Sequence, residues 1–500
     1  MMRIDGTMRR WLPVALFLAL AAHIGSPNVV FEGKAGPYAV RVIVRPPAVV
    51  PGRAEVVVQL PPGETAAVSI RPVFWRVGTA GSPSPDDAPR VAGSANVHAG
   101  QIWLMSRGSY SVYVTVDGAR GSGTAIVPVT SFATARLGLS RGLGVILITL
   151  GAVLFVGLVT IVRAATGEAL LEPGEKLDGA ARRRVRNATL VATPLLALLV
   201  LGGARWWGIV DGDYERTLYR PPAVDAGIDS IDGEPRLSLR VRDTWSLRAV
   251  FAPVIPDHGK MMHLFLISAG DHDRFGHYHP DEIDSLHFVT TLASFPRGRY
   301  RVFGDVLLAN GLSQTVTTTV EWPGSGSVRS DEAGDDARWS LETGPVATVN
   351  ERAHLGDGLT MVWTGGEEPL TAGRPVDLRF EVRDGADHVV PLAPYLEMAG
   401  HAVVLSADES VFIHLHPMGT ISTTAQETFA ARDRGDTTAD GRAHLPAGDS
   451  PTMHMTTMPM DGRLAFPYEF PKPGRYRVWV QVRRSPASHV LTGAFDLDVR

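Results

Sequence analysis

The sequence contains no cysteine among its 500 residues. Disulfide bonds, thiolate metal sites and cysteine nucleophiles are therefore excluded, and so is a blue-copper centre, which needs a cysteine ligand. An excess of charge of one sign is also lacking, because 48 basic and 52 acidic residues leave a formal net charge of −4. That balance gives no indication of a nucleic-acid partner. The sequence also lacks G-x-S-x-G, HExxH and phosphate-loop motifs, so we do not expect an enzyme.

Three apolar runs indicate a membrane protein. Residues 1–21 carry arginines followed by a short apolar stretch, which is typical of a signal peptide; an uncleaved anchor is the alternative. Residues 142–162 form a charge-free run that is long enough to cross ~30 Å of hydrocarbon. A second run, 188–204, contains Pro194 and ends before two tryptophans, as expected at a membrane interface. We therefore predict transmembrane helices over 141–163 and 188–207.

The connection between these two helices, residues 164–187, is basic. Cytoplasmic loops are enriched in lysine and arginine, so this loop is predicted to face the cytoplasm. Its basic residues, with the one at its edge, are Arg163, Lys176, Arg182, Arg183, Arg184 and Arg186. Both long flanking segments then lie on the opposite side of the membrane. The prediction is a bacterial inner-membrane protein whose soluble domains face the periplasm, where other envelope proteins are its expected partners.

The soluble segments are predicted to be mostly β. Short runs of alternating apolar and polar residues are separated by turns rich in glycine and proline. A glycine-x-tyrosine-x-valine pattern opens a predicted strand at residues 108, 298 and 474, which indicates an internal repeat. We predict three β-sandwich domains of an Ig-like or cupredoxin-like kind, with a linker and a mobile polar loop in the third. Their ranges are 22–140, 208–322 and 345–500 for the domains, 323–344 for the linker and 426–451 for the loop.

A second repeat carries three histidines in each of the last two domains. One histidine precedes a turn, and a His-x-His-Pro follows it; the residues are His263, His277 and His279, then His401, His414 and His416. In a strand, residues i and i+2 point to the same face. A hairpin around Asp408 and Glu409 would place His401 opposite His416, and the matching hairpin would place His263 opposite His279. The first domain, which has only His98, is predicted to be a spacer or docking module.

Three imidazoles at this spacing can bind one transition-metal ion. Imidazole suits both copper and zinc, and nearby thioethers favour copper in its reduced form. The predicted methionine ligands are Met418, Met453, Met455, Met458 and Met460. Three further histidines flank the first trio: His258, His272 and His287. We expect them to be exposed loop residues, and additional metal ligands are the alternative. Copper is the expected ion, and zinc is the alternative.

The segment from Pro394 through His401 to Pro417 resembles a motif of bacterial envelope proteins with YtkA-like or cupredoxin-like β-sandwich domains. The resemblance covers residues 375–485, and more weakly 235–322. It implies heavy-metal or copper handling, with His401, His414 and His416 at the matched positions. The long insertion after Met418 departs from a compact domain of this type.

Three functions follow from these patterns. The first is a membrane-anchored periplasmic protein that buffers, senses or delivers copper through its His-x-His-Pro hairpins. The second is an envelope scaffold whose histidines are structural. The third is a redox enzyme, for which the sequence supplies no substrate pocket.

Overall fold

The computed structural model describes most of the chain between residues 28 and 500. The described ranges are 28–169, 171–172, 174–231, 234–242, 253–284, 286–292, 295–324, 336, 340–341, 351–366, 368–436, 460–486 and 488–500. The chain divides into two compact units, one of residues Met1–Thr134 with Tyr219–Arg500 and one of Ala135–Leu218. The predicted signal peptide and most of the predicted linker lie outside the described residues.

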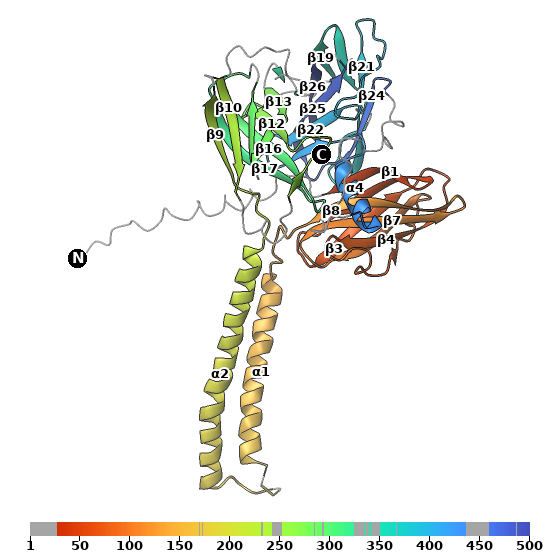
Figure 1. The fold of residues 1–500 in the computed structure, drawn as a ribbon. Helices are drawn as coiled ribbons and strands as arrows, with labels where there is room; N and C mark the ends of the chain where they lie inside the picture. Colours follow the sequence, from red (N-terminus) through yellow and green to blue (C-terminus); the bar gives the residue numbers. More distant parts are fainter. Residues whose placement is uncertain are drawn as a thin grey trace, which may run out of the picture. The chain divides into compact units, whose positions relative to one another are not determined.

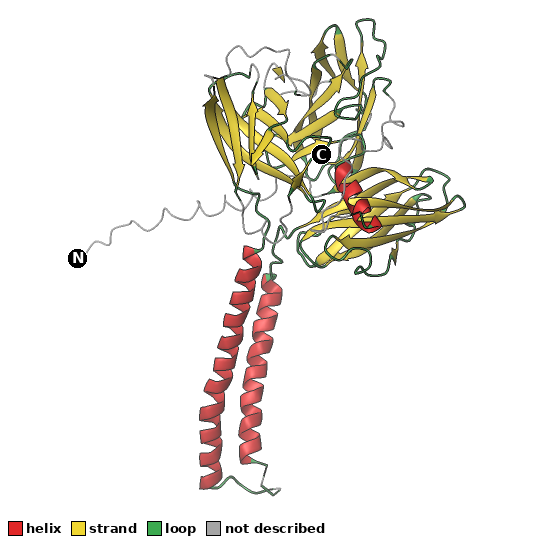
Figure 2. Ribbon diagram, in the orientation of Figure 1, coloured by secondary structure: helices red, strands yellow, loops and turns green. Residues whose placement is uncertain are grey.

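The larger unit is built from six antiparallel sheets that form β-sandwich domains (Figure 2). The first domain pairs one sheet of β1 (Val29–Ala35), β2 (Tyr38–Arg45), β3 (Gly52–Gln59) and β6 (Val97–Leu104) with a second of β5 (Asp86–Asp87), β4 (Ala66–Phe74), β7 (Gly108–Gly118) and β8 (Gly121–Ser131).

The second domain has the same two-layer plan. One sheet contains β14 (Asp281–Asp284), β15 (His287–Thr291), β10 (Glu234–Val241) and β9 (Val224–Ile231). The other contains β11 (Val254–Ile255), β16 (Gly298–Leu308), β12 (His263–Ser268), β13 (Arg274–Tyr278) and β18 (Ser340–Leu341), with β17 (Ser313–Trp322) paired to β16.

The third domain completes the series. One sheet contains β19 (Arg352–Gly356), β20 (Leu359–Trp363), β21 (Pro375–Arg383) and β24 (Arg463–Glu469). The other contains β23 (Phe412–Leu415), β22 (His401–Ser406), β25 (Gly474–Arg483) and β26 (Val490–Val499). Each predicted domain segment contains the strands of one pair of sheets, except that β18 lies in the predicted linker and pairs with β13 of the second domain.

The repeated glycine-x-tyrosine-x-valine pattern forms a long strand in every domain: β7, β16 and β25. Side chains alternate between the two faces of a strand. In β25, Tyr476 and Val478 therefore lie in the core of their own domain. Trp479 lies between the core residues Val478 and Val480 and points to the opposite face of the strand. It belongs to a separate apolar cluster made of residues from the second and third domains. One face of this strand stabilises its domain, and the other face contacts the neighbouring domain.

The predicted mobile loop of the third domain begins with a helix. Helix α4 (Thr423–Arg434) starts at the N-cap Ser422, whose side chain accepts a hydrogen bond from the Ala425 amide, as N-cap residues do. It ends at Gly435, which adopts the left-handed conformation that glycine tolerates best. The prediction of a mobile loop over residues 426–451 is thus wrong for residues 426–434, which are helical. Residues 437–459 lie outside the described residues.

The first domain packs against the third through a buried ion pair and a shared apolar cluster. Glu469 is fully buried, and its carboxylate accepts two hydrogen bonds from the Arg45 guanidinium at 2.9 and 2.6 Å and one from Asn28 at 2.6 Å. Bidentate arginine–carboxylate pairs are strong and directional. These contacts join the first domain to the third, and the predicted role of the first domain as a spacer or docking module stays a prediction.

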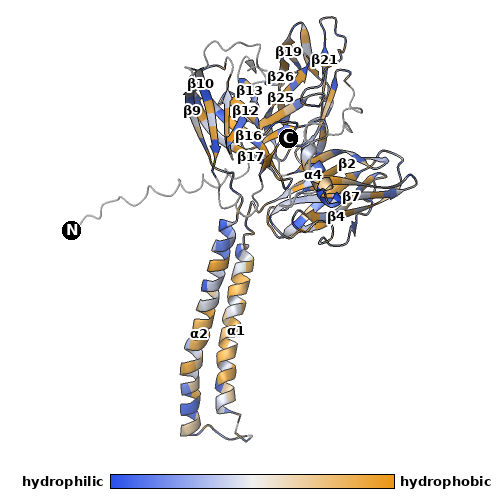
Figure 3. Ribbon diagram, viewed as in Figure 1, coloured by the Kyte–Doolittle hydropathy of each residue, from blue (hydrophilic) through white to orange (hydrophobic). Residues whose placement is uncertain are grey.

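The smaller unit contains two long helices, α1 (Arg141–Gly167) and α2 (Gly179–Arg216), drawn in Figure 1. Both are long and apolar enough to cross a membrane by length and composition, and their apolar side chains are exposed. Figure 3 shows the apolar residues along α1 and the polar residues toward the ends of α2. Helix α1 extends beyond its predicted range at its C-terminal end, and α2 extends beyond its range at both ends, where charged residues continue the helix.

Candidate metal centre

Two hairpins place the six predicted histidines in two groups. In the second domain Leu264 pairs with Tyr278, which aligns His263 with His279. In the third domain Ala402 pairs with Leu415, which aligns His401 with His416. Within each group the possible ligand atoms lie within 4.8 Å of one another. We call His263, His277 and His279 the first triad, and His401, His414 and His416 the second triad. The cross-strand alignment predicted from the sequence is confirmed in both hairpins.

Three of these histidines donate a hydrogen bond to a backbone carbonyl. His263 Nε2 lies 3.2 Å from the Asp257 carbonyl oxygen, and His401 Nε2 lies 3.2 Å from that of Tyr395. His416 Nδ1 lies 3.1 Å from the Ile421 carbonyl oxygen. A carbonyl can only accept, so each of these nitrogens carries the hydrogen. In a neutral ring the opposite nitrogen then presents a lone pair.

Polar side chains lie beside the other three rings, and two of them are within hydrogen-bond distance. His279 Nδ1 lies 2.6 Å from an Asp336 carboxylate oxygen. His277 Nδ1 lies 2.8 Å from Gln481 Oε1, and His414 Nδ1 lies 3.7 Å from Asp305 Oδ2. Contacts of this kind fix the orientation and tautomer of metal-binding histidines.

Two inward nitrogens of each triad lie within hydrogen-bond distance of each other. His263 Nδ1 and His277 Nε2 are 3.2 Å apart, and His401 Nδ1 and His414 Nε2 are 3.1 Å apart. Ligands bound tetrahedrally at ~2.0–2.1 Å are separated by about 3.3 Å. The third inward nitrogen of each triad, on His279 or His416, is buried and has no hydrogen-bond partner in the described part of the chain. Each triad thus brings three imidazole nitrogens together, which is a donor set that a metal ion can use.

Burial keeps these imidazoles in the neutral form that binds metal. Desolvation is the largest influence on all six, lowering the pKa of His263 to about 4 and that of His416 to about 3. The pKa values of the other four are lowered well below the usual histidine value. Protons therefore compete weakly with a metal ion at neutral pH.

The two triads face each other where the second and third domains meet. The ring centroids of His263 and His414 are 5.1 Å apart, and those of His277 and His414 are 5.7 Å apart. Beside them, aromatic rings stack across the same boundary: Phe303 on Phe412 at 4.1 Å, and Phe275 on Trp479 at 5.0 Å. Apolar packing between the two sheets thus brings the triads together.

Each domain also orients the middle histidine of the other. Asp305 lies opposite His263 in its own sheet, yet its carboxylate lies beside His414 of the third domain. Gln481 lies opposite His401 in its own sheet, yet its side chain binds His277 of the second domain. This exchange follows the approximate symmetry of the two sequence repeats. Neither triad has its full set of supporting contacts unless the domains are docked.

Replacing Gln481 with leucine should weaken metal binding at the first triad selectively. The substitution removes the acceptor for His277 Nδ1–H and leaves only the Tyr395 hydroxyl, 3.2 Å away, to orient that ring. Loss of such a contact typically reduces metal affinity about 10- to 100-fold. Competition with a chromophoric Cu(I) chelator measures the change. Gln481→Glu, which keeps an acceptor, is the control, and equal weakening by both variants would contradict the explanation.

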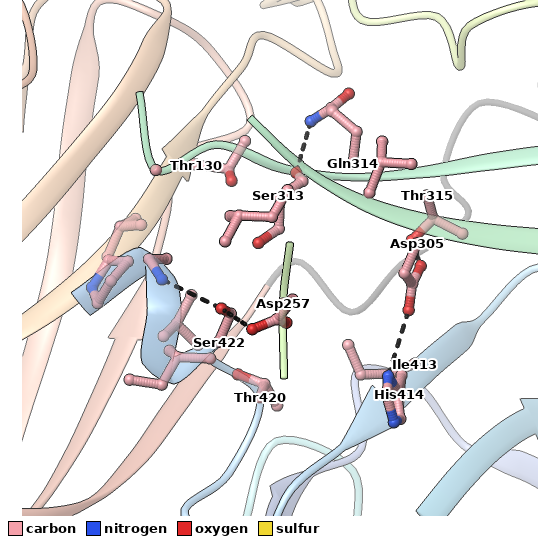
Figure 4. A pocket seen from close by; sticks show the side chains of 18 of the residues that line it. Thr130, Asp257, Asp305, Ser313, Gln314, Thr315, Ile413, His414, Thr420 and Ser422 are labelled. Carbon is pink, nitrogen blue, oxygen red and sulfur yellow. Dashed lines mark hydrogen bonds and ion pairs between the residues drawn. The ribbon is translucent and has the colours of Figure 1, made fainter. Parts of the chain in front are cut away.

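A cavity of about 430 Å³ lies beside the two triads (Figure 4). Residues of all three domains line it, including His263, His414 and His416. Two carboxyl groups also line it: Asp257 accepts a hydrogen bond from Ser422 at 2.8 Å, and Asp305 accepts one from Thr315 at 2.6 Å. Burial raises the pKa of Asp305 to about 7. A cation that reaches the triads through this cavity would meet carboxyl groups first.

The predicted methionine ligands lie elsewhere or outside the described residues. Met418 packs with Met398 in the apolar core cluster of the first domain. Its thioether is therefore part of the contact between the first and third domains. The prediction that Met418 is a ligand at the second triad is thus wrong. Met460 packs against the core of the third domain. The remaining three predicted ligands, Met453, Met455 and Met458, lie outside the described residues.

The flanking histidines were expected to be exposed, and two of them are buried. The His258 side chain is 4% exposed, and its ring lies 5.1 Å from that of His416. His272 is buried and bonds Glu409 of the third domain at 3.0 Å. His287 bonds Ser238 and Arg240 in its own sheet. The local sequence around His258 has no strand pattern, so only the docking of the domains reveals its surroundings.

Comparison with known proteins gives a family match for the third domain. A model of a domain of unknown function, DUF8832, matches residues 353–500, which contain the second triad. No curated protein matches the chain significantly.

Solved structures with some similarity include E. coli alpha-2-macroglobulin in its native conformation, with 9% identity and a TM-score of 0.20 over 96% of this chain and 23% of that one. Another is the ICAM-5 D1–D4 ectodomain fragment, with 9% identity and a TM-score of 0.16 over 93% and 83% of the two chains. This chain thus spans less than a quarter of the macroglobulin.

Only part of the predicted resemblance is shown, and it comes from the sheets of the structure itself. The β-sandwich domains are present, but neither the family match nor these structures carry a YtkA-like or cupredoxin-like name. The metal-binding hypothesis therefore depends on the geometry of the triads.

Proposed function

We propose that this protein is a membrane-anchored envelope protein that binds copper at a paired site between its second and third domains. The observation that carries the proposal is the convergence of three imidazole nitrogens in each triad. The outward nitrogens of five of the six rings lie within 3.2 Å of an acceptor. Two of these inward nitrogens are buried without a partner. An unpaired buried polar atom costs free energy, and a bound ion would offset that cost twice.

The charge of the site favours the reduced, monovalent ion. Neither triad contains a carboxylate among its ligand atoms, so the protein does not neutralise the bound ion directly. The cost of burying an ion rises with the square of its charge, which makes two adjacent divalent ions far more costly than two Cu(I) ions. Imidazole ligands and an oxidising compartment without cysteine are both compatible with copper. Buffering or delivery of copper is the role that such a site would serve.

The anchor and the location form part of the same proposal. Two long helices with exposed apolar side chains would be stable in a bilayer, and they are joined by a segment with several arginines. That segment would face the cytoplasm, and the sandwich domains would lie in the periplasm. Reactivity of single introduced cysteines toward a membrane-impermeant reagent tests this orientation, because the native chain has no cysteine.

Metal titration of the detergent-solubilised full chain tests the function. We expect two Cu(I) ions per chain, and one per chain in either the His277→Ala/His279→Ala or the His414→Ala/His416→Ala double variant, since each removes both His-x-His ligands of one triad. The matched control is His388→Ala, whose side chain is 79% exposed, and it should still bind two ions. Elemental analysis after gel filtration measures the ratio. If the unmutated chain bound no copper, the proposal would be excluded. Tighter binding of zinc than of copper would show that the site is a zinc site.

A further inference from the structure

We propose that His258, from the second domain, is a fourth imidazole ligand for the ion bound by the second triad. This inference rests on the proposed function and assigns a further ligand to the same site. The His258 ring lies 5.1 Å from that of His416 and 5.9 Å from that of His401, and farther, 6.4 Å, from that of His263. It is therefore closer to the triad of the other domain than to the neighbouring histidine of its own.

The two nitrogens of His258 have different surroundings. Nδ1 lies 3.5 Å from a carboxylate oxygen of Glu397. Among the described residues, Nε2 is buried without a hydrogen-bond partner and lies 3.8 Å from the nearest Asp257 oxygen. The inward nitrogen of His416 is likewise buried without a partner in that part of the chain. Adjacent rings that each carry such a nitrogen can share one metal ion.

The turn that carries His258 does not need a histidine. The third domain forms the same turn: the bridge between Asp257 and Lys260 has its counterpart between Tyr395 and Met398. The residue that matches His258 is Leu396, with φ 48° against 49°. Leucine therefore satisfies the backbone at this position, and an imidazole there adds chemistry that the fold does not require.

A fourth nitrogen makes the two metal sites unequal. The first triad provides three imidazoles, whereas the second triad with His258 provides four, and four nitrogen ligands suit the tetragonal geometry of Cu(II). The carboxylates of Asp257 and Glu397 lie beside His258, where they would compensate the greater charge. The second triad thus becomes a site for copper in both oxidation states.

Electron paramagnetic resonance of Cu(II) tests the assignment in the full chain. The His277→Ala/His279→Ala double variant removes both His-x-His ligands of the first triad, so that one equivalent of Cu(II) binds at the second triad alone. We expect nitrogen hyperfine splitting from four imidazoles in this background. Adding His258→Leu should reduce the count to three and weaken Cu(II) binding at least about 10-fold. Because leucine occupies the matching position in the third domain, this variant is expected to fold.

Rescue by free imidazole separates ligation from a structural role. His258→Gly suits the left-handed backbone and leaves space for a ring. Added imidazole should restore the four-nitrogen spectrum in this variant and leave His258→Leu unchanged. An unaltered spectrum and affinity in His258→Leu would overturn the assignment while leaving the paired copper site intact. If the unmutated chain binds no copper, both proposals fail together.

Discussion

Acidification of the metal-free protein from pH 7 to pH 4 is expected to unfold its second and third domains. The six triad histidines are buried with lowered pKa values, whereas in an unfolded chain each would titrate near 6.5. The unfolded state therefore binds more protons between these values, and stability that is complete above pH 6.5 is lost as the pH falls. For His263, with a pKa of about 4, the total loss is about 3 kcal/mol.

Denaturant unfolding at successive pH values measures this loss. Each histidine contributes up to about 1.4 kcal/mol per pH unit, so His416→Phe should make the dependence less steep by that amount. His388→Ala, on the surface, should leave it unchanged. Saturating Cu(I) should move the unfolding to lower pH, because a bound ion stabilises only the folded state. Stability that stays constant from pH 6.5 to 5 would show that the triad histidines are accessible to protons.

Trp479→Ala is expected to separate the two domains and to weaken copper binding at both triads. The Trp479 ring is fully buried and stacks on Phe275 of the second domain with an interplanar angle of 15°. Removing a buried tryptophan costs about 3–5 kcal/mol. Here the lost packing energy is that of the contact between the second and third domains. This contact places Gln481 beside His277 and Asp305 beside His414. Domain separation should therefore remove supporting contacts from both triads together.

Val478→Ala is the matched control, because this neighbouring residue packs in the core of the third domain instead. It should lower the melting temperature while leaving the copper affinity of the folded protein unchanged. Trp479→Ala should change both, with protease sensitivity appearing between the domains. Equal copper affinity in the two variants would show that each triad binds its ion without the neighbouring domain.

The composition of each triad could be read from the sequence because it depends on short-range geometry. His-x-His places two rings on one face of a strand, and the turn length sets which residue lies opposite. The two apolar helices were also evident, since an unbroken apolar run is a local property. Alternation of apolar and polar residues likewise indicated the sandwich domains before any contact was known.

The relation between the triads could not be read in this way, because it depends on docking between segments more than a hundred residues apart. Gln481, Asp305 and His258 acquire their places only when the two sheets stack. Met418 shows the opposite case: its sequence position suggested a ligand, but the first domain covers it with apolar side chains. Helix α4 was missed because its polar sequence becomes ordered by packing.

Strand period and turn length, which act within about twenty residues, determined that this chain has two three-histidine hairpins and two apolar helices. Tertiary structure alone decided that the hairpins face each other and support each other's histidines. The reason is that stacking of aromatic rings across two sheets is a property of both surfaces at once, and neither sequence segment specifies it alone.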